Sequence, residues 1–144
     1  MLLRLEHANI TVTDVDAAKR FLKIAFPEFK VRGSGTTENE EYTKRWEHFG
    51  TDERYLALEM LDPPGATDRK PYRDPGVNHI GFVVGDLPAL RDRLMAAGYW
   101  AGDLREEGEG PARLRSYIFD DLGMEWEFVQ YLTEDVEKMN VYEP

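Results

Sequence analysis

Two of the three histidines in this chain lie at matching places in two similar segments. His7 is in "LEHANITVTD" (residues 5–14) and His79 is in "VNHIGFVVGD" (residues 77–86), and an aspartate follows each histidine after seven residues. Imidazole nitrogen is the commonest metal ligand among protein side chains. We therefore interpret the repeated histidine as part of a metal site.

The remaining ligands can come from two glutamates on later strands. In "YLALEM" (residues 55–60) every second residue is large and apolar, so strand alternation places Glu59 on the face away from the helices. In "MEWEFVQ" (residues 124–130) the same alternation places Glu127 on that face. Each half of the chain thus offers one histidine and one glutamate on the open face of its sheet.

Four such side chains suit one divalent cation. A single histidine or glutamate on a strand is more often structural, but a buried carboxylate without a partner is costly. A cation shared by two imidazoles and two carboxylates removes that cost and leaves two of six positions for water or substrate. The predicted ligands are His7, Glu59, His79 and Glu127, and they suit Ni, Zn or Co, with Mn and Fe as further candidates.

An internal repeat, offset by 72 residues from His7 to His79, must position these side chains. Each copy has the pattern of a strand, a helix and three strands, so the predicted fold is α+β with two βαβββ modules, residues 1–68 and 69–144, acting as a single compact domain. A linker rich in Pro and Gly, 62–76, divides them. Asp14 and Asp86 are expected to cap the two helices, a turn is expected at 33–41, and a short helix is expected after Thr133. The expected strands are 5–12, 28–34, 42–50, 53–61, 77–84, 99–105, 112–119 and 124–131.

Charge and composition argue against several classes of protein. The chain has 28 acidic and 18 basic residues, a formal charge of −10 and no stripe of Lys or Arg, which argues against nucleic acid as a partner. It has no apolar run long enough to cross a membrane, no signal-peptide pattern and no cysteine. We expect a cytoplasmic protein that acts on a small molecule.

Four stretches carry a resemblance that extends over nearly the whole chain: "HANITVTDVDAAKRFL", "YLALEM", "NHIGFVVGDLPALRDRL" and "YIFDDLGMEWEFVQ". They resemble the vicinal oxygen chelate superfamily, which includes glyoxalase I, fosfomycin-resistance proteins, methylmalonyl-CoA epimerase, extradiol dioxygenases and bleomycin-binding proteins. The resemblance implies curved mixed sheets that form a cup around the metal, with the helices on the outer face. It also implies a homodimer with sites between modules.

Within that superfamily, the ligand order His, Glu, His, Glu is similar to glyoxalase I of the short bacterial kind. Fosfomycin-resistance proteins and extradiol dioxygenases instead use two histidines and one glutamate. Two contacts that glutathione-using glyoxalases commonly make are missing here: Thr11 stands in place of an Arg and Pro63 in place of an Asn. The resemblance therefore implies the same chemistry with a substrate that need not contain glutathione.

The implied function is that of a lactoylglutathione lyase-like metalloenzyme, a lyase or isomerase. The cation stabilises a metal-bound enediolate formed from a small molecule with two adjacent oxygens. Glu127, with Glu59 as its partner across the metal, is the expected catalytic base. The candidate substrate contacts are Tyr55, Tyr117, Trp46 and Thr11.

Two alternatives remain open at this stage. One is a related epimerase or dioxygenase, and a dioxygenase would consume oxygen. The other is a small-molecule binding or resistance protein, metal-free or metal-assisted, and the metal-free form would be indifferent to chelators. His48 has no counterpart in the repeat and is expected at an exposed or hairpin-edge place, while the loop 103–113 is expected to be a lid or a hairpin connection.

Overall fold

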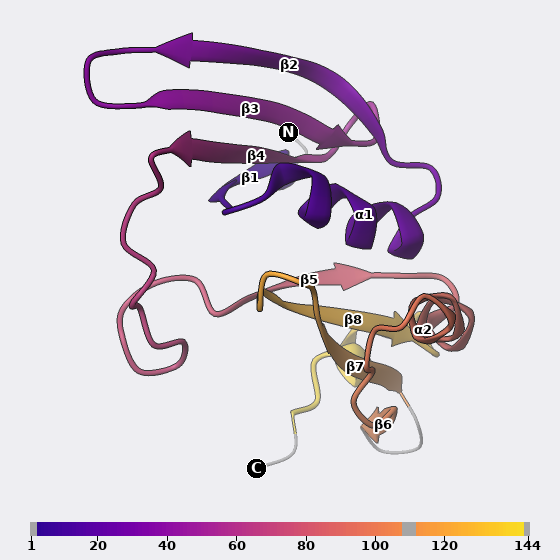
Figure 1. Ribbon diagram of the computed structural model, residues 1–144. Helices are drawn as coiled ribbons and strands as arrows, with labels where there is room; N and C mark the ends of the chain where they lie inside the picture. The colour runs from indigo at the N-terminus through magenta and orange to yellow at the C-terminus, as the bar shows by residue number, and fades with distance from the viewer. Residues whose placement is uncertain (1–2, 108–111, 143–144) are drawn as a thin grey trace. The chain divides into compact units, whose positions relative to one another are not determined.

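The computed structural model describes residues 3–107 and 112–142 and divides the chain into two compact units between Arg69 and Lys70. Each unit has a four-stranded mixed sheet with a helix on one face (Figure 1). The chain order within each unit is strand, helix and three strands. The predicted α+β fold with two βαβββ modules is therefore confirmed.

The first unit begins with the strand that carries His7. Its sheet has the order β1-β4-β3-β2, in which β1 and β4 run parallel and the other pairs are antiparallel. Its elements are β1 His7–Thr11, α1 Val15–Ala25, β2 Lys30–Glu38, β3 Thr43–Gly50 and β4 Tyr55–Asp62.

Helix α1 begins where the sequence predicts, because Asp14 caps it. The Asp14 side chain accepts hydrogen bonds from the backbone N–H groups of Asp16 and Ala17, at 2.9 and 3.0 Å. The helix packs on β3 and β4 through apolar residues at helical spacing. The buried helix residues are Val15, Ala18, Phe21, Leu22 and Ala25, and the sheet contributes Leu56 and Leu58.

The second unit repeats this plan with the sheet order β5-β8-β7-β6. Its elements are β5 His79–Val83, α2 Leu87–Ala96, β6 Arg105–Glu107, β7 Arg113–Phe119 and β8 Glu125–Tyr131, followed by the short tail helix α3 Val136–Met139. Its core includes Leu87, Leu90, Leu94, Ile118, Trp126 and Phe128.

Within the described ranges no helix is long and apolar enough to cross a membrane.

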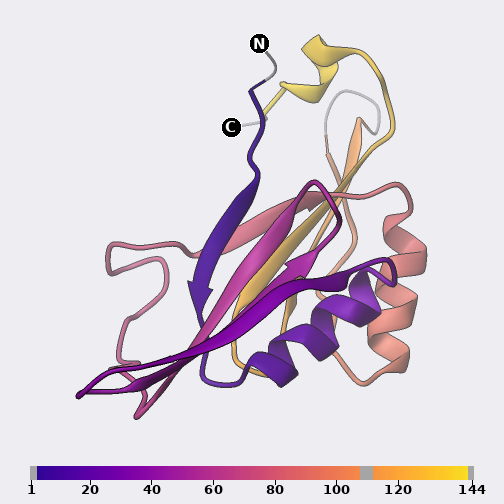
Figure 2. The same cartoon turned by 90° about the horizontal axis from the view of Figure 1, so that it is seen from above.

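Strand β2 is longer than predicted. It continues to Glu38 and forms a long hairpin with β3 (Figure 2), so the turn expected over 33–41 shrinks to the residues around Asn39. Gly35, in the stretch where a turn was expected, instead makes room for an indole, because a Cβ atom there would lie 2.8 Å from the Trp46 ring. Glycine here serves a close approach within a strand rather than a turn.

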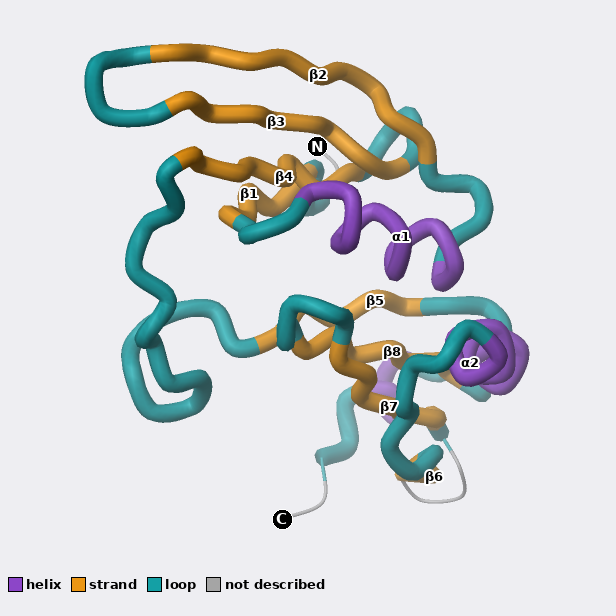
Figure 3. The backbone as a smooth tube through the Cα atoms, viewed as in Figure 1, coloured by secondary structure: helices purple, strands orange, loops and turns teal. Residues whose placement is uncertain are grey.

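Strand β6 is shorter than predicted. The expected strand 99–105 is reduced to a single bridge between Ala101 and Ile118, and only Arg105–Glu107 pairs with β7. The loop 103–113, expected as a lid or connection, therefore includes β6 and the start of β7 (Figure 3), while 108–111 lie outside the described residues.

A cluster of four charged side chains ties α1 to β3. Arg45 donates to both carboxylate oxygens of Asp16 at 3.0 Å, and Lys19 donates to the buried Glu47 at 2.7 Å. The hydrogen bonds from Arg45 and Lys19 lower the pKa of Asp16 to about 2. Burial acts to raise the pKa of Glu47, but hydrogen bonds from Lys19 and Arg45 outweigh it, so the pKa falls below its ordinary value.

This cluster should make the fold less stable in acid. A carboxyl group whose pKa is lower in the folded than in the unfolded state stabilises the fold above its unfolded pKa, and this stabilisation disappears as the pH falls. Because the Asp16 side chain is 66% exposed, Asp16→Asn should lower the free energy of unfolding at pH 7 by less than about 1 kcal/mol. The difference from the unmodified protein should shrink below about pH 4 and vanish below about pH 2. Urea unfolding at a series of pH values measures it, and a difference that grows in acid would contradict the prediction.

Candidate metal centre

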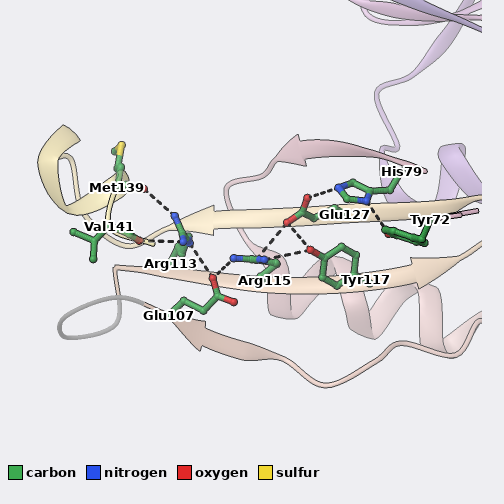
Figure 4. Close-up of polar contacts among 9 residues, drawn as sticks. All are labelled: Tyr72, His79, Glu107, Arg113, Arg115, Tyr117, Glu127, Met139 and Val141. Carbon is green, nitrogen blue, oxygen red and sulfur yellow. Dashed lines mark hydrogen bonds and ion pairs between the residues drawn. The ribbon is translucent and has the colours of Figure 1, made fainter. Parts of the chain in front are cut away.

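The second unit brings His79 and Glu127 together on the open face of its sheet. Strands β5 and β8 pair in parallel, and Glu127 lies opposite Gly81, two residues beyond His79. The Nε2 atom of His79 is 3.0 Å from Oε2 of Glu127 (Figure 4). Both side chains are partly buried, with 30% and 16% of their surfaces exposed.

Gly81 lies directly beside the carboxylate of Glu127. A Cβ atom at Gly81 would lie 3.4 Å from Oε2 of Glu127, at ordinary van der Waals distance. The carboxylate thus lies against the backbone of β5, on the strand that carries His79.

The second carboxylate oxygen of Glu127 has partners of its own. Its Oε1 atom accepts a hydrogen bond from the Tyr117 hydroxyl at 3.2 Å and lies 3.3 Å from Nε of Arg115. Arg115 also donates to the Tyr117 hydroxyl and to Glu107. These contacts orient the carboxylate so that Oε2 faces His79.

The other ring nitrogen of His79 also has a partner. Its Nδ1 atom is 2.9 Å from the Tyr72 hydroxyl, which in turn donates a short hydrogen bond to Glu125. That hydrogen bond raises the pKa of Tyr72 to about 12, so the phenol keeps its proton near neutral pH. A histidine that binds metal usually has its second nitrogen held in this way.

The donor set of the second unit fits a divalent cation. Imidazole nitrogen and carboxylate oxygen bind Zn²⁺ and similar ions at about 2.1 Å. Two ligand atoms at right angles in an octahedral site are then about 3.0 Å apart. The observed 3.0 Å between Nε2 and Oε2 equals this separation, although a hydrogen bond between the two groups would have the same length.

The first unit is arranged differently. His7 lies opposite Tyr55, and Glu59 lies opposite Thr11, four residues further along β1. Four residues of strand span about 13 Å, whereas His79 and Glu127 are offset by only two residues, about 7 Å. Glu59 instead lies 3.4 Å from Nζ of Lys44.

The residue of β4 that corresponds to Glu127 is Ala57. Ala57 lies opposite Asn9, two residues beyond His7, just as Glu127 lies opposite Gly81. The sequence reading that gave the two glutamates equivalent places is therefore wrong. The predicted role of Glu59 as a ligand stays a prediction.

A group of rings, which we call the ring cluster, covers the open face of the first unit. His7 stacks on Tyr55 with centroids 4.8 Å apart, His48 lies 4.6 Å from Tyr55, and Trp46 lies 5.0 Å from His48. The guanidinium of Arg32 lies 4.2 Å from the centroid of the Tyr55 ring. His48 is half-buried in β3, between β2 and β4, so the expected exposed or hairpin-edge place is wrong.

The structure thus separates the predicted site residues into two sets, with Glu59 and Thr11, which lie opposite each other on β4 and β1, in neither. His79, Glu127 and Tyr117 are in mutual contact, and His7, Tyr55 and Trp46 belong to the ring cluster. In the part of the chain that the structure describes, no three His, Asp or Glu side chains gather closely enough to hold an ion by themselves.

Sequence reasoning missed three residues of the second unit. Arg115 could have been found, because it alternates with Tyr117 on the open face of β7. Glu125 could also have been found, because it alternates with Glu127 on the open face of β8. Tyr72 lies in the linker, where strand alternation says nothing, so no sequence signal pointed to it.

These observations define a chain of two βαβββ units, each with its own mixed sheet and helix. The family model described as Glyoxalase/Bleomycin resistance protein/Dioxygenase superfamily matches residues 4–128. The chain therefore belongs to this superfamily. No curated protein matched the sequence.

Solved structures show the same fold. A glyoxylase/bleomycin resistance protein/dioxygenase domain from a Frankia species has 22% identity and a TM-score of 0.72, covering 91% of this chain and 99% of that one. A glyoxalase family protein from Bacillus cereus has 20% identity and a TM-score of 0.73, covering 92% and 97%. A variant of the fosfomycin resistance protein FosX from Listeria monocytogenes, complexed with Mn(II) and a dihydroxypropylphosphonic acid, has 16% identity and a TM-score of 0.66, covering 96% and 98%.

Proposed function

We propose that the protein is a divalent-metal-dependent enzyme that acts on a small molecule with two adjacent oxygens. The observation that carries this proposal is the pair His79 and Glu127, whose donor atoms are 3.0 Å apart and suit one cation. Membership of the superfamily supports it, because the related FosX structure contains Mn(II).

We further propose that His7 is the third ligand. In the register of β1 and β4, Ala57 occupies the place where a fourth ligand equivalent to Glu127 would lie. Glu59 lies two residues further along β4 than that place. A set of two histidines and one glutamate is the set that fosfomycin-resistance proteins and dioxygenases use, so the register supports a relative of these enzymes over a four-ligand glyoxalase I.

In this mechanism Glu127 is the group that moves a proton. A bound divalent cation supplies Lewis acidity, which lowers the energy of negative charge on a substrate oxygen. Tyr117 and Arg115 hold Oε1 of Glu127, so Oε2 is the oxygen that would bind the cation and also the one that would accept a proton from the substrate or from an attacking water. The bond of Glu127 to the cation would therefore have to be the labile one. The hydroxyl of Tyr117 lies beside this carboxylate and is the favoured substrate contact.

The experiment that tests the proposal is a calorimetric titration of the chelator-treated protein with Zn²⁺, Mn²⁺, Co²⁺ and Ni²⁺. The unmodified protein should bind at least one of these ions, and His79→Ala should lower the affinity for it by more than about 100-fold. The reason is that losing a residue that only hydrogen-bonds to a ligand already costs about 10–100-fold in affinity, and losing the ligand itself costs more. Glu59→Gln should retain the affinity. Binding that survives His79→Ala would reject the site.

The substrate can be sought with a small panel. Hemithioacetals made with glutathione and with other thiols test the lyase reaction, and fosfomycin tests the reaction that the FosX relatives suggest. Because Thr11 and Pro63 replace the expected glutathione contacts, a hemithioacetal of another thiol should be no worse a substrate than the glutathione adduct.

A second candidate function is binding without catalysis, and the ring cluster is the observation that favours it. Four rings and a guanidinium on one open face suit a flat, electron-rich molecule. A protein of this kind would bind such a molecule equally well with and without a chelator. The expected homodimer is a separate prediction, which sedimentation equilibrium would test.

A further inference from the structure

Tyr72 forms a bridge between His79 and Glu125. Its hydroxyl is 2.9 Å from Nδ1 of the imidazole and donates a short hydrogen bond to Oε2 of the carboxylate. Glu125 lies directly opposite His79 in the sheet, so the two groups that the phenol joins are held by paired strands. The phenol itself comes from the linker, outside the sheet.

The hydrogen count of this bridge determines the direction of each bond. A phenol has one proton, and a carboxylate can only accept, so the Tyr72 proton points to Glu125. The Tyr72 oxygen must then accept from His79, which requires the imidazole proton to be on Nδ1. The lone pair of a neutral ring is consequently on Nε2, the atom that faces Glu127.

We propose that Tyr72 and Glu125 are positioning residues that keep the His79 proton on Nδ1 and leave Nε2 free to bind a cation. This inference rests on the proposed metal site and adds the hydrogen bonds that hold His79 in the tautomer able to bind the cation. Glu127 competes for a proton on Nε2 through Oε2, and the hydrogen bond from Tyr117 and the charge of Arg115, both at Oε1, draw negative charge away from that oxygen. The Tyr72 oxygen, by contrast, becomes a stronger acceptor when it donates to Glu125.

The backbone around Tyr72 supports a specific role. Its φ angle is +63°, in the left-handed region that bulky residues rarely adopt. The strain is stabilised locally, because the Tyr72 N–H donates to the Asn78 side chain at 2.7 Å and the Lys70 N–H donates to Asp74 at 2.7 Å. A large residue held in a costly conformation beside a candidate ligand suggests function rather than packing, all the more because Tyr72 is 62% exposed.

The first test uses nitrogen NMR of the metal-free protein at a pH where the His79 ring is neutral. The unmodified protein should show the proton on Nδ1. Tyr72→Phe removes the acceptor, so the proton should move to Nε2, where Glu127 can accept it. The proton on Nε2 in the unmodified protein, or the same tautomer in both proteins, would overturn the proposal whether or not the protein binds metal.

The matched control is Tyr99→Phe. Tyr99 also donates its hydroxyl proton to a carboxylate in the same unit, that of Asp121 at 2.7 Å. This variant loses the same chemical group away from His79. It should leave the His79 tautomer unchanged.

A second test separates the bridge from ordinary packing. In Glu125→Ala the Tyr72 proton loses its acceptor and can turn to Nδ1, so the imidazole proton should again move to Nε2. Glu125→Gln keeps an oxygen that accepts the Tyr72 proton and should restore the original tautomer. The double variant Tyr72→Phe, Glu125→Ala should lower the fraction of His79 rings with the proton on Nδ1 no further than either single variant does. Independent packing effects on that fraction would instead add.

Metal affinity gives the third readout. Because Tyr72 is largely exposed, Tyr72→Phe should weaken Zn²⁺ binding by about 10-fold, the lower end of the effect of losing a residue that hydrogen-bonds to a metal ligand. Tyr99→Phe should leave the Zn²⁺ affinity unchanged. Equal Zn²⁺ affinity of the Tyr72→Phe and unmodified proteins would contradict the positioning role. Failure of the unmodified protein to bind any metal would instead reject the proposed function, and the tautomer measurement would still decide the present inference.

Discussion

Replacing Glu127 with Gln is expected to lower turnover by about 100- to 10,000-fold, the range that a general base contributes. Gln has the same shape and keeps one oxygen for a cation, but it cannot accept a proton. It also loses the negative charge beside Arg115, so the orienting contact at 3.3 Å weakens. The substrate is whichever member of the panel the unmodified protein converts.

The measurement combines rates with metal content. The matched control is Glu59→Gln, which removes a carboxylate on the corresponding strand of the other unit and should change the rate by less than about threefold, within the small effect expected of a carboxylate away from the chemistry. Full turnover of the Glu127→Gln protein with metal still bound would exclude Glu127 as the base. Equal losses in the two variants would instead support the four-ligand site expected from the sequence.

Replacing Gly50 with Ala is expected to lower the free energy of unfolding of the first unit by about 3 kcal/mol, the upper end of the typical cost of forcing an extra carbon into a packed site. A Cβ atom there would lie 2.3 Å from the backbone oxygen of Arg54 and 2.5 Å from Cα of Tyr55. Backbone atoms cannot move aside as a side chain tip can. The turn between β3 and β4 must therefore shift, and the Tyr55 ring that stacks on His7 shifts with it.

The control for this change is Gly85→Ala, because a Cβ atom at Gly85 would have nothing within 4 Å. Its urea midpoint should stay close to that of the unmodified protein, since surface substitutions usually change stability by less than about 0.5 kcal/mol. Comparing the urea transitions of the three proteins measures both effects. Similar midpoints for the two variants would show that the β3–β4 turn can absorb a methyl group.

Much of the fold could be predicted from the sequence because its signals are local. The alternation of apolar residues in β4 and β8 and the caps Asp14 and Asp86 each concern residues a few positions apart. The alternation that puts Glu127 on the open face with His79 also puts its neighbour Trp126 on the opposite, core face, where Trp126 is 1% exposed. Such patterns depend only on the periodicity of a strand or a helix.

Register and turn geometry could not be predicted in this way. Alternation assigns Glu59 to a face, but only strand pairing shows that Ala57, not Glu59, corresponds to Glu127. A shift of two residues keeps the face and changes the neighbours, so no periodic signal can detect it.

The sequence by itself thus determined the two βαβββ units, their core and the open face on which the candidate chemistry lies. The tertiary structure decided which side chains on that face touch one another, and it brought Tyr72 from the linker to His79. The physical reason is that faces follow from the periodicity of one segment, whereas contacts follow from the pairing and turns of segments far apart in the chain.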